Sequence, residues 1–179
     1  GAAGSAHINF IADADGVYRK APIAIKYSEK IFFALGVEAA IKFMNIQPNE
    51  IALDENCLRL KNRALALEGS KFIYLNFSEV EEKSPRFAYS DVLKGLIPEK
   101  NFKNKIVFIG QTSQGSPGAD ILQTPFKEKY GVIMQANVTN TILRDFDIRR
   151  TNRYKTCFWI ILLCVLTCLI MIYVKAWFS

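Results

Sequence analysis

The chain has 179 residues, half of them hydrophobic, and a net charge of +6. Five cations border one long apolar stretch near the carboxyl terminus, which leaves residues 1–148 with a charge of only +1: Arg149, Arg150, Arg153, Lys155 and Lys175. A cluster there suits lipid phosphates, and no nucleic-acid-binding signature accompanies it, so we expect no nucleic-acid partner. Only one cysteine lies outside the apolar stretch, so this part of the chain cannot form an internal disulfide. With one histidine as well, the sequence has almost no residues for a zinc site or a His-based catalytic pair. We therefore expect no metal and no cofactor.

Two apolar runs near the amino terminus, His7–Ile11 and Val17–Ile25, flank the turn-forming sequence Asp13-Ala-Asp-Gly16. This pattern predicts an antiparallel hairpin. Pro22 within the second run predicts an edge strand or a bulge. The turn also resembles the start of a calcium loop, but an EF-hand would need a further ligand where Val17 stands and a distant Glu. We prefer the turn.

A helix and a series of short strands are predicted next. Helical spacing covers residues 31–44, and the predicted core-facing positions are Phe32, Leu35, Ala39 and Phe43. Short apolar runs with polar breaks predict a meander that leads into one longer strand: Ile51–Leu53, Cys57–Leu60, Ala64–Leu67 and Phe72–Phe77. A helix of one or two turns is predicted between Ser90, as its N-cap, and Gly95.

The run Lys105–Gly110 has four consecutive apolar residues, which predicts a strand covered on both faces. A loop containing Gly115–Gly118 follows, and then a helix over residues 131–144. The predicted core face of this helix carries Val132, Ala136, Thr139 and Leu143. The alternation of strands and helices predicts an α/β fold with a mixed, mostly parallel sheet, helices on its faces and an antiparallel hairpin.

In α/β folds a ligand commonly binds outside the carboxyl end of a strand, which makes the segment after Gly110 the candidate binding region. Its candidate ligand-binding residues are Thr112, Asp120, Thr124, Gln135 and Asn137. Structural roles remain open for them: Asp120 could cap a turn, Thr124 precedes Pro125, and Asn137 could brace the loop backbone.

Residues 156–174 contain no charged residue. As a helix they extend about 28 Å at about 1.5 Å per residue, close to the thickness of a bilayer core. Aromatic residues lie at or near both ends of the stretch: Tyr154, Trp159, Tyr173 and Trp177. We expect a domain at 1–148, a basic juxtamembrane segment at 149–155, a transmembrane helix at 156–174 and the start of a further loop at 175–179.

Several blocks of the chain together resemble the CHASE2 extracytoplasmic sensor domain. The resemblance is carried, in order, by Gly4–Pro22 with its His-Ile-Asn-Phe and Asp-Ala-Asp-Gly-Val-Tyr-Arg sequences, by Tyr89–Gly95, by Lys105–Gly110, and by a closing pattern: Asp120, Thr124-Pro125, Gly131-Val132, Ala136-Asn137 and the helix to Leu143. Gln135 departs from a common His, and Tyr130 from a frequent Pro. The chain is similar to the later portion of the domain, so we expect that its amino-terminal part is missing.

The resemblance implies a bacterial receptor in the cytoplasmic (inner) membrane. Its sensor domain would bind a small-molecule or other periplasmic ligand outside the cell and relay the signal through transmembrane helices to a cyclase or kinase absent from this chain. We expect a homodimer in contact with the lipid bilayer. On this view the segment itself is not an enzyme.

Two other classes of protein are weighed against a receptor. The sequence between Gly110 and Gly115 has the glycine spacing of a phosphate loop but lacks its Lys, which leaves a membrane-anchored nucleotide-binding enzyme as a weak alternative. A structural subunit of a membrane complex fits the span but gives no reason for the polar residues after Gly110.

The charge count gives an orientation that conflicts with the resemblance, because most cations precede the span and the positive-inside rule alone would place residues 1–148 in the cytoplasm.

Overall fold

The computed structural model describes residues 4–69, 71–77, 84–112, 120–145, 148, 151 and 153–177. The predicted loop Gly115–Gly118 lies outside these residues. The chain forms two units, Gly1–Ile148 and Arg149–Ser179, and each is described by itself.

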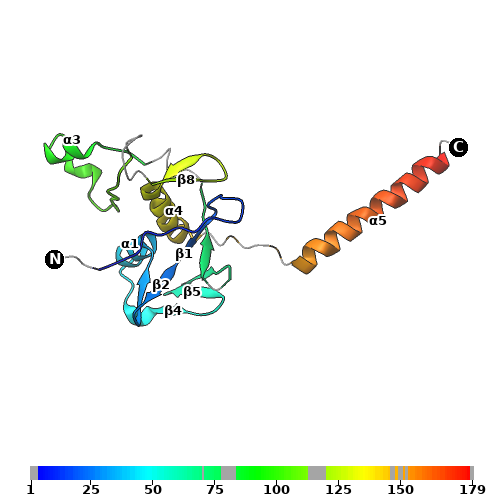
Figure 1. Cartoon of the computed structure of the whole chain (residues 1–179), viewed down its shortest axis with the longest axis horizontal. Coiled ribbons are helices and arrows are strands. Elements are labelled where there is room, and N and C mark those ends of the chain that lie inside the picture. The colour runs from blue at the N-terminus through cyan, green and yellow to red at the C-terminus, as the bar shows by residue number, and fades with distance from the viewer. Residues whose placement is uncertain are drawn as a thin grey trace. The chain divides into compact units, whose positions relative to one another are not determined.

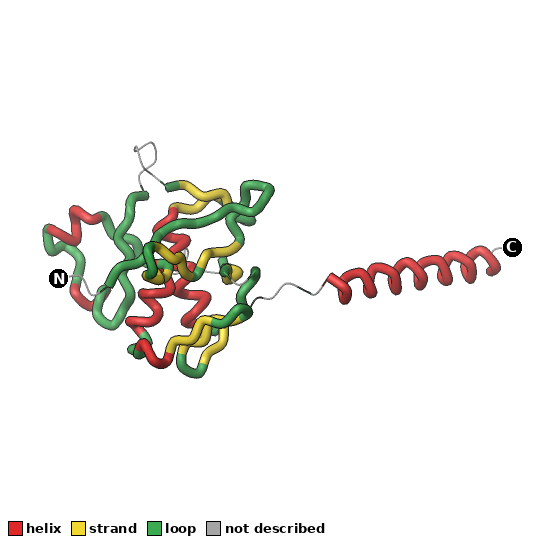
Figure 2. The backbone as a smooth tube through the Cα atoms, turned by 60° about the horizontal axis from the view of Figure 1, so that its bottom comes forward, coloured by secondary structure: helices red, strands yellow, loops and turns green. Residues whose placement is uncertain are grey.

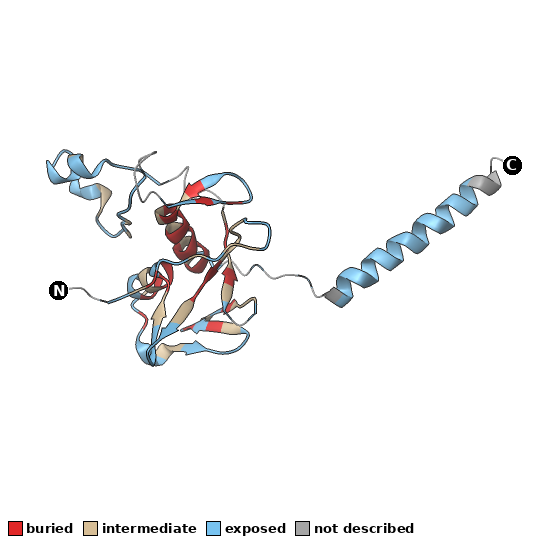
Figure 3. Cartoon of the chain, viewed as in Figure 1, coloured by how far each residue is buried: buried red, intermediate tan, exposed pale blue. Residues whose placement is uncertain are grey.

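Two helices form the centre of the first unit. Helix α1 (Leu35–Phe43) packs against α4 (Gly131–Leu143), and Figure 1 shows short strands around this pair. The two helices approach closely at Gly36, where an added Cβ would lie 2.6 Å from the Val138 Cβ. Glycine at this position therefore permits the helix contact. Figure 3 shows α4 as a largely buried helix.

The strands form four small antiparallel sheets in the described part of the chain (Figure 2). Strand β1 (Lys20–Pro22) pairs with β7 (Phe72–Tyr74), and β2 (Ala24–Tyr27) forms a hairpin with β3 (Lys30–Phe33). The remaining sheets are the meander of β4 (Ile51–Leu53), β5 (Cys57–Leu60) and β6 (Arg63–Ala66), and the hairpin of β8 (Ile121–Gln123) and β9 (Glu128–Tyr130). The fully buried core includes Ile23, Val37, Leu58, Met134 and Val138.

The predicted α/β class and the three-stranded meander are confirmed, with β4 and β5 at their predicted bounds, but the mostly parallel sheet is not found among the described strands. The longer strand predicted at Phe72–Phe77 is the three-residue β7, which pairs with β1 and not with the meander. The predicted amino-terminal hairpin is only partly right. Backbone hydrogen bonds form the turn at Asp13–Gly16, but β1 pairs with the distant β7 rather than with residues 7–11. Pro22 ends a strand of a two-stranded sheet, which is the predicted edge position.

The predicted strand at Lys105–Gly110 is wrong: these residues form no strand, and the described strands pair only in the antiparallel direction. The segment is half-buried at Ile106 and Phe108, whereas Val107 is exposed and Ile109 is 78% exposed. A β-strand requires the backbone of a neighbouring strand, and no described strand lies beside this one. Apolar composition alone therefore misled the strand prediction.

The core faces of the two long helices also differ from the prediction. Helix α1 begins at Leu35 because residues 30–33 form β3, and it buries Gly36, Val37, Ala40 and Ile41 while Phe43 is exposed. The large apolar residues suggested one face, but the close approach of α4 favours the face with small residues. Helix α4 buries nine of its thirteen residues, so its burial extends well beyond the predicted face.

Residues 84–112 include the short helix α3 (Tyr89–Leu93) and the 3-10 turn η2 (Glu99–Asn101). Ala88 rather than Ser90 is the N-cap residue, and Gly95 ends the turn with a φ of 70°, as its predicted role requires. The rings of Phe87 and Phe102 meet edge to face at 5.8 Å. No residue of this segment is fully buried. A second 3-10 turn, η1 (Pro48–Glu50), precedes β4.

The second unit consists of helix α5 (Arg153–Trp177). Residues Tyr154–Val174 are long and apolar enough to cross a membrane, and none of their side chains is buried in the described structure (Figure 3). Apolar side chains exposed around a whole helix are stable in lipid rather than in water.

Candidate functional site

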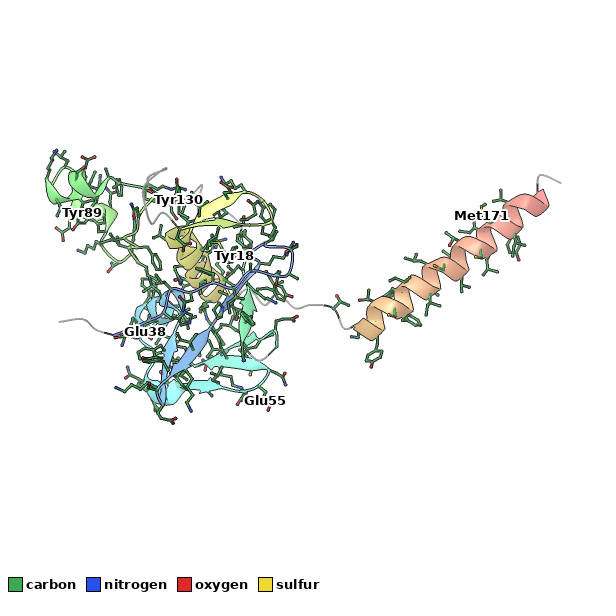
Figure 4. The ribbon with its side chains drawn as sticks, in the orientation of Figure 1. Tyr18, Glu38, Glu55, Tyr89, Tyr130 and Met171 are labelled. Atoms are coloured by element: carbon green, nitrogen blue, oxygen red, sulfur yellow. The ribbon has the colours of Figure 1, made fainter. Side chains whose placement is uncertain are left out.

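Helix α4 carries two of the candidate residues, and its position determines what they can do. Tyr130, labelled in Figure 4, is its N-cap residue and ends β9. No charged side chain occurs between Gly131 and Leu143, yet four polar side chains of the helix are buried: Gln135, Asn137, Thr139 and Thr141. Buried polar groups need hydrogen-bond partners, so their contacts identify the elements that α4 holds.

Gln135 connects α4 to two segments that are distant in the sequence. Its side-chain oxygen accepts a hydrogen bond from the Gly36 N–H at 2.9 Å, and its side-chain nitrogen donates to the Ile8 carbonyl at 3.2 Å. Gly36 lies in the first turn of α1, where N–H groups have no partner within the helix, and Ala34 provides no side-chain cap. Gln135 therefore acts as a cap supplied by another helix. Gln135 is only 2% exposed, so its side chain is buried in the core.

The threonines extend this contact along α4. The Thr139 hydroxyl donates to the Gly36 carbonyl at 2.7 Å, so both backbone groups of Gly36 bond to α4. The Thr141 hydroxyl donates to the Asn137 carbonyl at 2.8 Å and accepts from the Asn76 N–H at 3.0 Å. One face of α4 thus binds α1 and another binds the segment that follows β7.

The carboxyl end of α4 is held from the meander. Arg63 in β6 donates to the carbonyls of Ile142 and Leu143, both at 2.7 Å. The last carbonyls of a helix lack intrahelical partners and carry partial negative charge. The guanidinium of Arg63 donates hydrogen bonds to them and places a positive charge beside them. Sequence reasoning missed this contact because 79 residues separate Arg63 from Ile142 and no local pattern connects them.

Asp120 and Thr124 lie at the two ends of β8. The Asp120 carbonyl accepts from the Gly131 N–H at 2.8 Å. A Cβ at position 131 would meet the Asp120 carboxylate, so glycine there leaves room for this side chain. Thr124 is buried, and its hydroxyl donates to the Lys127 carbonyl, which closes the turn between β8 and β9. Asp120 is exposed to solvent and Thr124 is not.

The five candidate residues therefore do not line one surface. Thr112 and Asp120 are exposed, whereas Thr124, Gln135 and Asn137 are buried. Asn137 is 0% exposed; its amide nitrogen donates to the Ile133 carbonyl at 3.0 Å, and its side-chain oxygen has no partner among the described residues. Thr112 and Asp120 are left as the members of the set that a ligand can reach.

The aspartates of the amino-terminal turn are engaged by cations of the chain. Arg19 contacts Asp13 at 3.0 Å and Asp15 at 2.7 Å, and Lys20 contacts Asp13 at 3.1 Å. Hydrogen bonds from Arg19 lower the pKa of Asp15 to about 2. Among the described residues no group of three or more His, Cys, Asp or Glu side chains could hold a metal ion. This geometry is that of a turn braced by salt bridges.

Comparison with models of known protein families identifies the family of the chain. The family model described as the CHASE2 domain matches residues 1–174. No curated protein and no solved structure gives a significant match to the chain.

The first prediction concerns Gln135 as a brace. Gln135→Leu should lower the free energy of unfolding by about 1–3 kcal/mol, because it leaves the buried Gly36 N–H without a partner and removes the hydrogen bond to the Ile8 carbonyl. Chemical unfolding of the chain in detergent micelles measures the change. Gln123→Leu is the matched control: Gln123 is exposed in β8, and its replacement should change stability by less than about 0.5 kcal/mol. Equal effects of the two substitutions would show that Gln135 is not a brace.

Proposed function

The chain belongs to the CHASE2 family of sensor domains, which is typical of extracytoplasmic receptors, and on this premise we propose that it relays a stimulus to a cytoplasmic cyclase or kinase. CHASE2 domains are sensor domains and not catalytic ones. In the proposed receptor, residues 1–148 lie outside the inner membrane, α5 crosses it, and two copies of the chain form a homodimer.

The observation that supports a relay is the position of α4 in the chain and in the core. Its side chains and carbonyls bind α1, the segment after β7 and β6, and only residues 144–152 separate it from α5. A stimulus that alters any of these contacts would favour another position of α4. Such a relay requires two arrangements of the helix whose populations the stimulus changes.

Ligand contact is proposed for the exposed candidates alone. Thr112 and Asp120 border residues 113–119, and the backbone of Asp120 is bonded to Gly131, the first residue of α4. A small polar ligand that bound Asp120 would act on the start of α4 directly. The buried residues Gln135, Thr124 and Asn137 would not touch the ligand. They would affect its binding only by stabilising the fold.

A labelling experiment tests the proposed orientation. Asn62 lies in the exposed turn between β5 and β6, and a cysteine there, with the four native cysteines replaced by serine, should react with a membrane-impermeant maleimide in intact cells. Leu58→Cys in the same background is the control: position 58 is fully buried, so it should react only after denaturation. Reaction of Asn62→Cys only after cell lysis would place the domain in the cytoplasm, as the positive-inside count suggests.

The relay is tested in the full receptor without any knowledge of its ligand. Gln135→Leu should change the basal activity of the output module, because it weakens the contact between α1 and α4. A flexible Gly-Ser insertion after Asp147 should abolish this difference in output between Gln135→Leu and the unmutated receptor.

The control is the same insertion in the exposed turn at Lys103–Asn104, which leaves Arg63 in place and should preserve the effect of Gln135→Leu. If the effect survives the insertion after Asp147, the connection between α4 and α5 does not carry the signal.

A further inference from the structure

His7 is the one histidine of the chain, and its backbone pairs with that of Ala34, the residue before α1. Its backbone N–H donates to the Phe33 carbonyl at 3.0 Å, and its carbonyl accepts from the Leu35 N–H at 2.8 Å. Leu35 is the first residue of α1. The backbone of His7 thus joins the end of β3 to the beginning of the helix that Gln135 caps.

The side chain of His7 has no compensation for its burial. The residue is 7% exposed, and neither ring nitrogen has a hydrogen-bond partner among the described residues. A neutral imidazole offers one donor and one acceptor, whereas the protonated ring carries a charge and two donors. Burial of the charged form without partners costs considerably more free energy than burial of the neutral form.

The charged groups on the elements around His7 do not favour its protonation. On α1 the ionisable side chains are Glu38, labelled in Figure 4, and Lys42, which contact each other at 3.6 Å. Strand β3 contributes Lys30, and neither α4 nor residues 4–12 contain another ionisable side chain. The amino terminus of α1 carries partial positive charge, which also opposes a cation. Desolvation by burial lowers the pKa of His7 below its ordinary value of 6.5.

The same segment contacts α4 one residue further on. The carbonyl of Ile8 accepts one of the two hydrogen bonds that Gln135 makes outside its own helix. Displacement of residues 5–10 would therefore remove the partner of the Gln135 amide nitrogen, in addition to the backbone contact of His7 at the start of α1.

We propose that His7 is an acid-sensitive latch: protonation of its ring releases residues 5–10 from α1 and from Gln135. The importance of this latch for signalling rests on the proposed function, in which acidification outside the membrane would be one stimulus of the receptor. The latch itself is a property of the domain and does not depend on any output module.

The sign of the pH dependence follows from the lowered pKa. Above about pH 6.5 the ring is neutral in both the closed and the released state, and the latch keeps its full stability. As the pH falls below this value the released state binds a proton that the closed state does not, so stability is lost until the closed-state pKa is reached. Within that window the ratio of released to closed molecules should rise about tenfold per pH unit.

The test uses the full chain in detergent micelles. Because there is one histidine, a single imidazole proton resonance reports its titration, and we expect a midpoint below pH 6.5. Hydrogen exchange at the His7 and Leu35 amides, corrected for intrinsic pH dependence, should show protection falling about tenfold per pH unit in the same window. A ring that titrates at or above pH 6.5 would overturn the latch.

Matched variants assign the effect to His7. His7→Phe and His7→Met fill the site with an apolar side chain that does not titrate. The fall in protection at the Leu35 amide should therefore disappear in whichever variant folds. Asp15→Asn should retain it, because the pKa of Asp15, at about 2, lies far below pH 6.5, where the fall in protection begins. Persistence of the fall in protection in a folded His7 variant would refute the proposal.

A further comparison separates the latch from the proposed function. If the latch opens with acid in the purified chain while the output of the full receptor is unaffected by acid, the latch stands and acid-stimulated relay fails. If the ring does not titrate below pH 6.5, the latch fails and the relay retains its own tests.

Discussion

The domain depends on one interaction, in which the Gln135 side chain satisfies the Gly36 N–H in the first turn of α1. Helix α1 begins directly after β3 and has no side-chain N-cap of its own, so its first turn needs a partner from elsewhere. That partner is available because Gly36 has no Cβ: an added Cβ would lie 2.6 Å from the Val138 Cβ and would push α4 away. Thr139 bonds to the carbonyl of the same glycine, and the helix pair is thereby fixed in one register.

This arrangement makes α4 both the core of the domain and a polar connection between its parts. An apolar helix would pack in several registers at similar free energy, whereas Gln135, Thr139 and Thr141 each require particular partners. Arg63 adds a constraint at the carboxyl end, the end nearest in sequence to α5. Small changes at α1, at the segment around His7 or at the meander therefore all act on one helix, as a sensor that reports through a single connection would require.

Local patterns in the sequence were sufficient to predict the elements that form through contacts between residues close in the chain. The meander strands are short, mostly apolar runs separated by polar turn residues, so the bounds of β4 and β5 were predictable. The strand at Lys105–Gly110 was not, since its apolar residues meet no described neighbouring strand. In the candidate site, the exposure of Asp120 agrees with a binding role, whereas the bracing role of Gln135 depends on Gly36, 99 residues away. Long-range hydrogen bonds of this kind leave no periodic signal in one sequence.

The central claim, that Gln135 holds α1 and α4 together, is tested most directly by native-state hydrogen exchange of the Gly36 amide. First-turn amides of an ordinary helix have no intrahelical partner and exchange through local fraying. Our account predicts that the Gly36 amide exchanges only on global unfolding, with the same opening free energy as the amides of Met134 and Val138 in the buried part of α4. Fast exchange of the Gly36 amide while the α4 amides remain protected would contradict it.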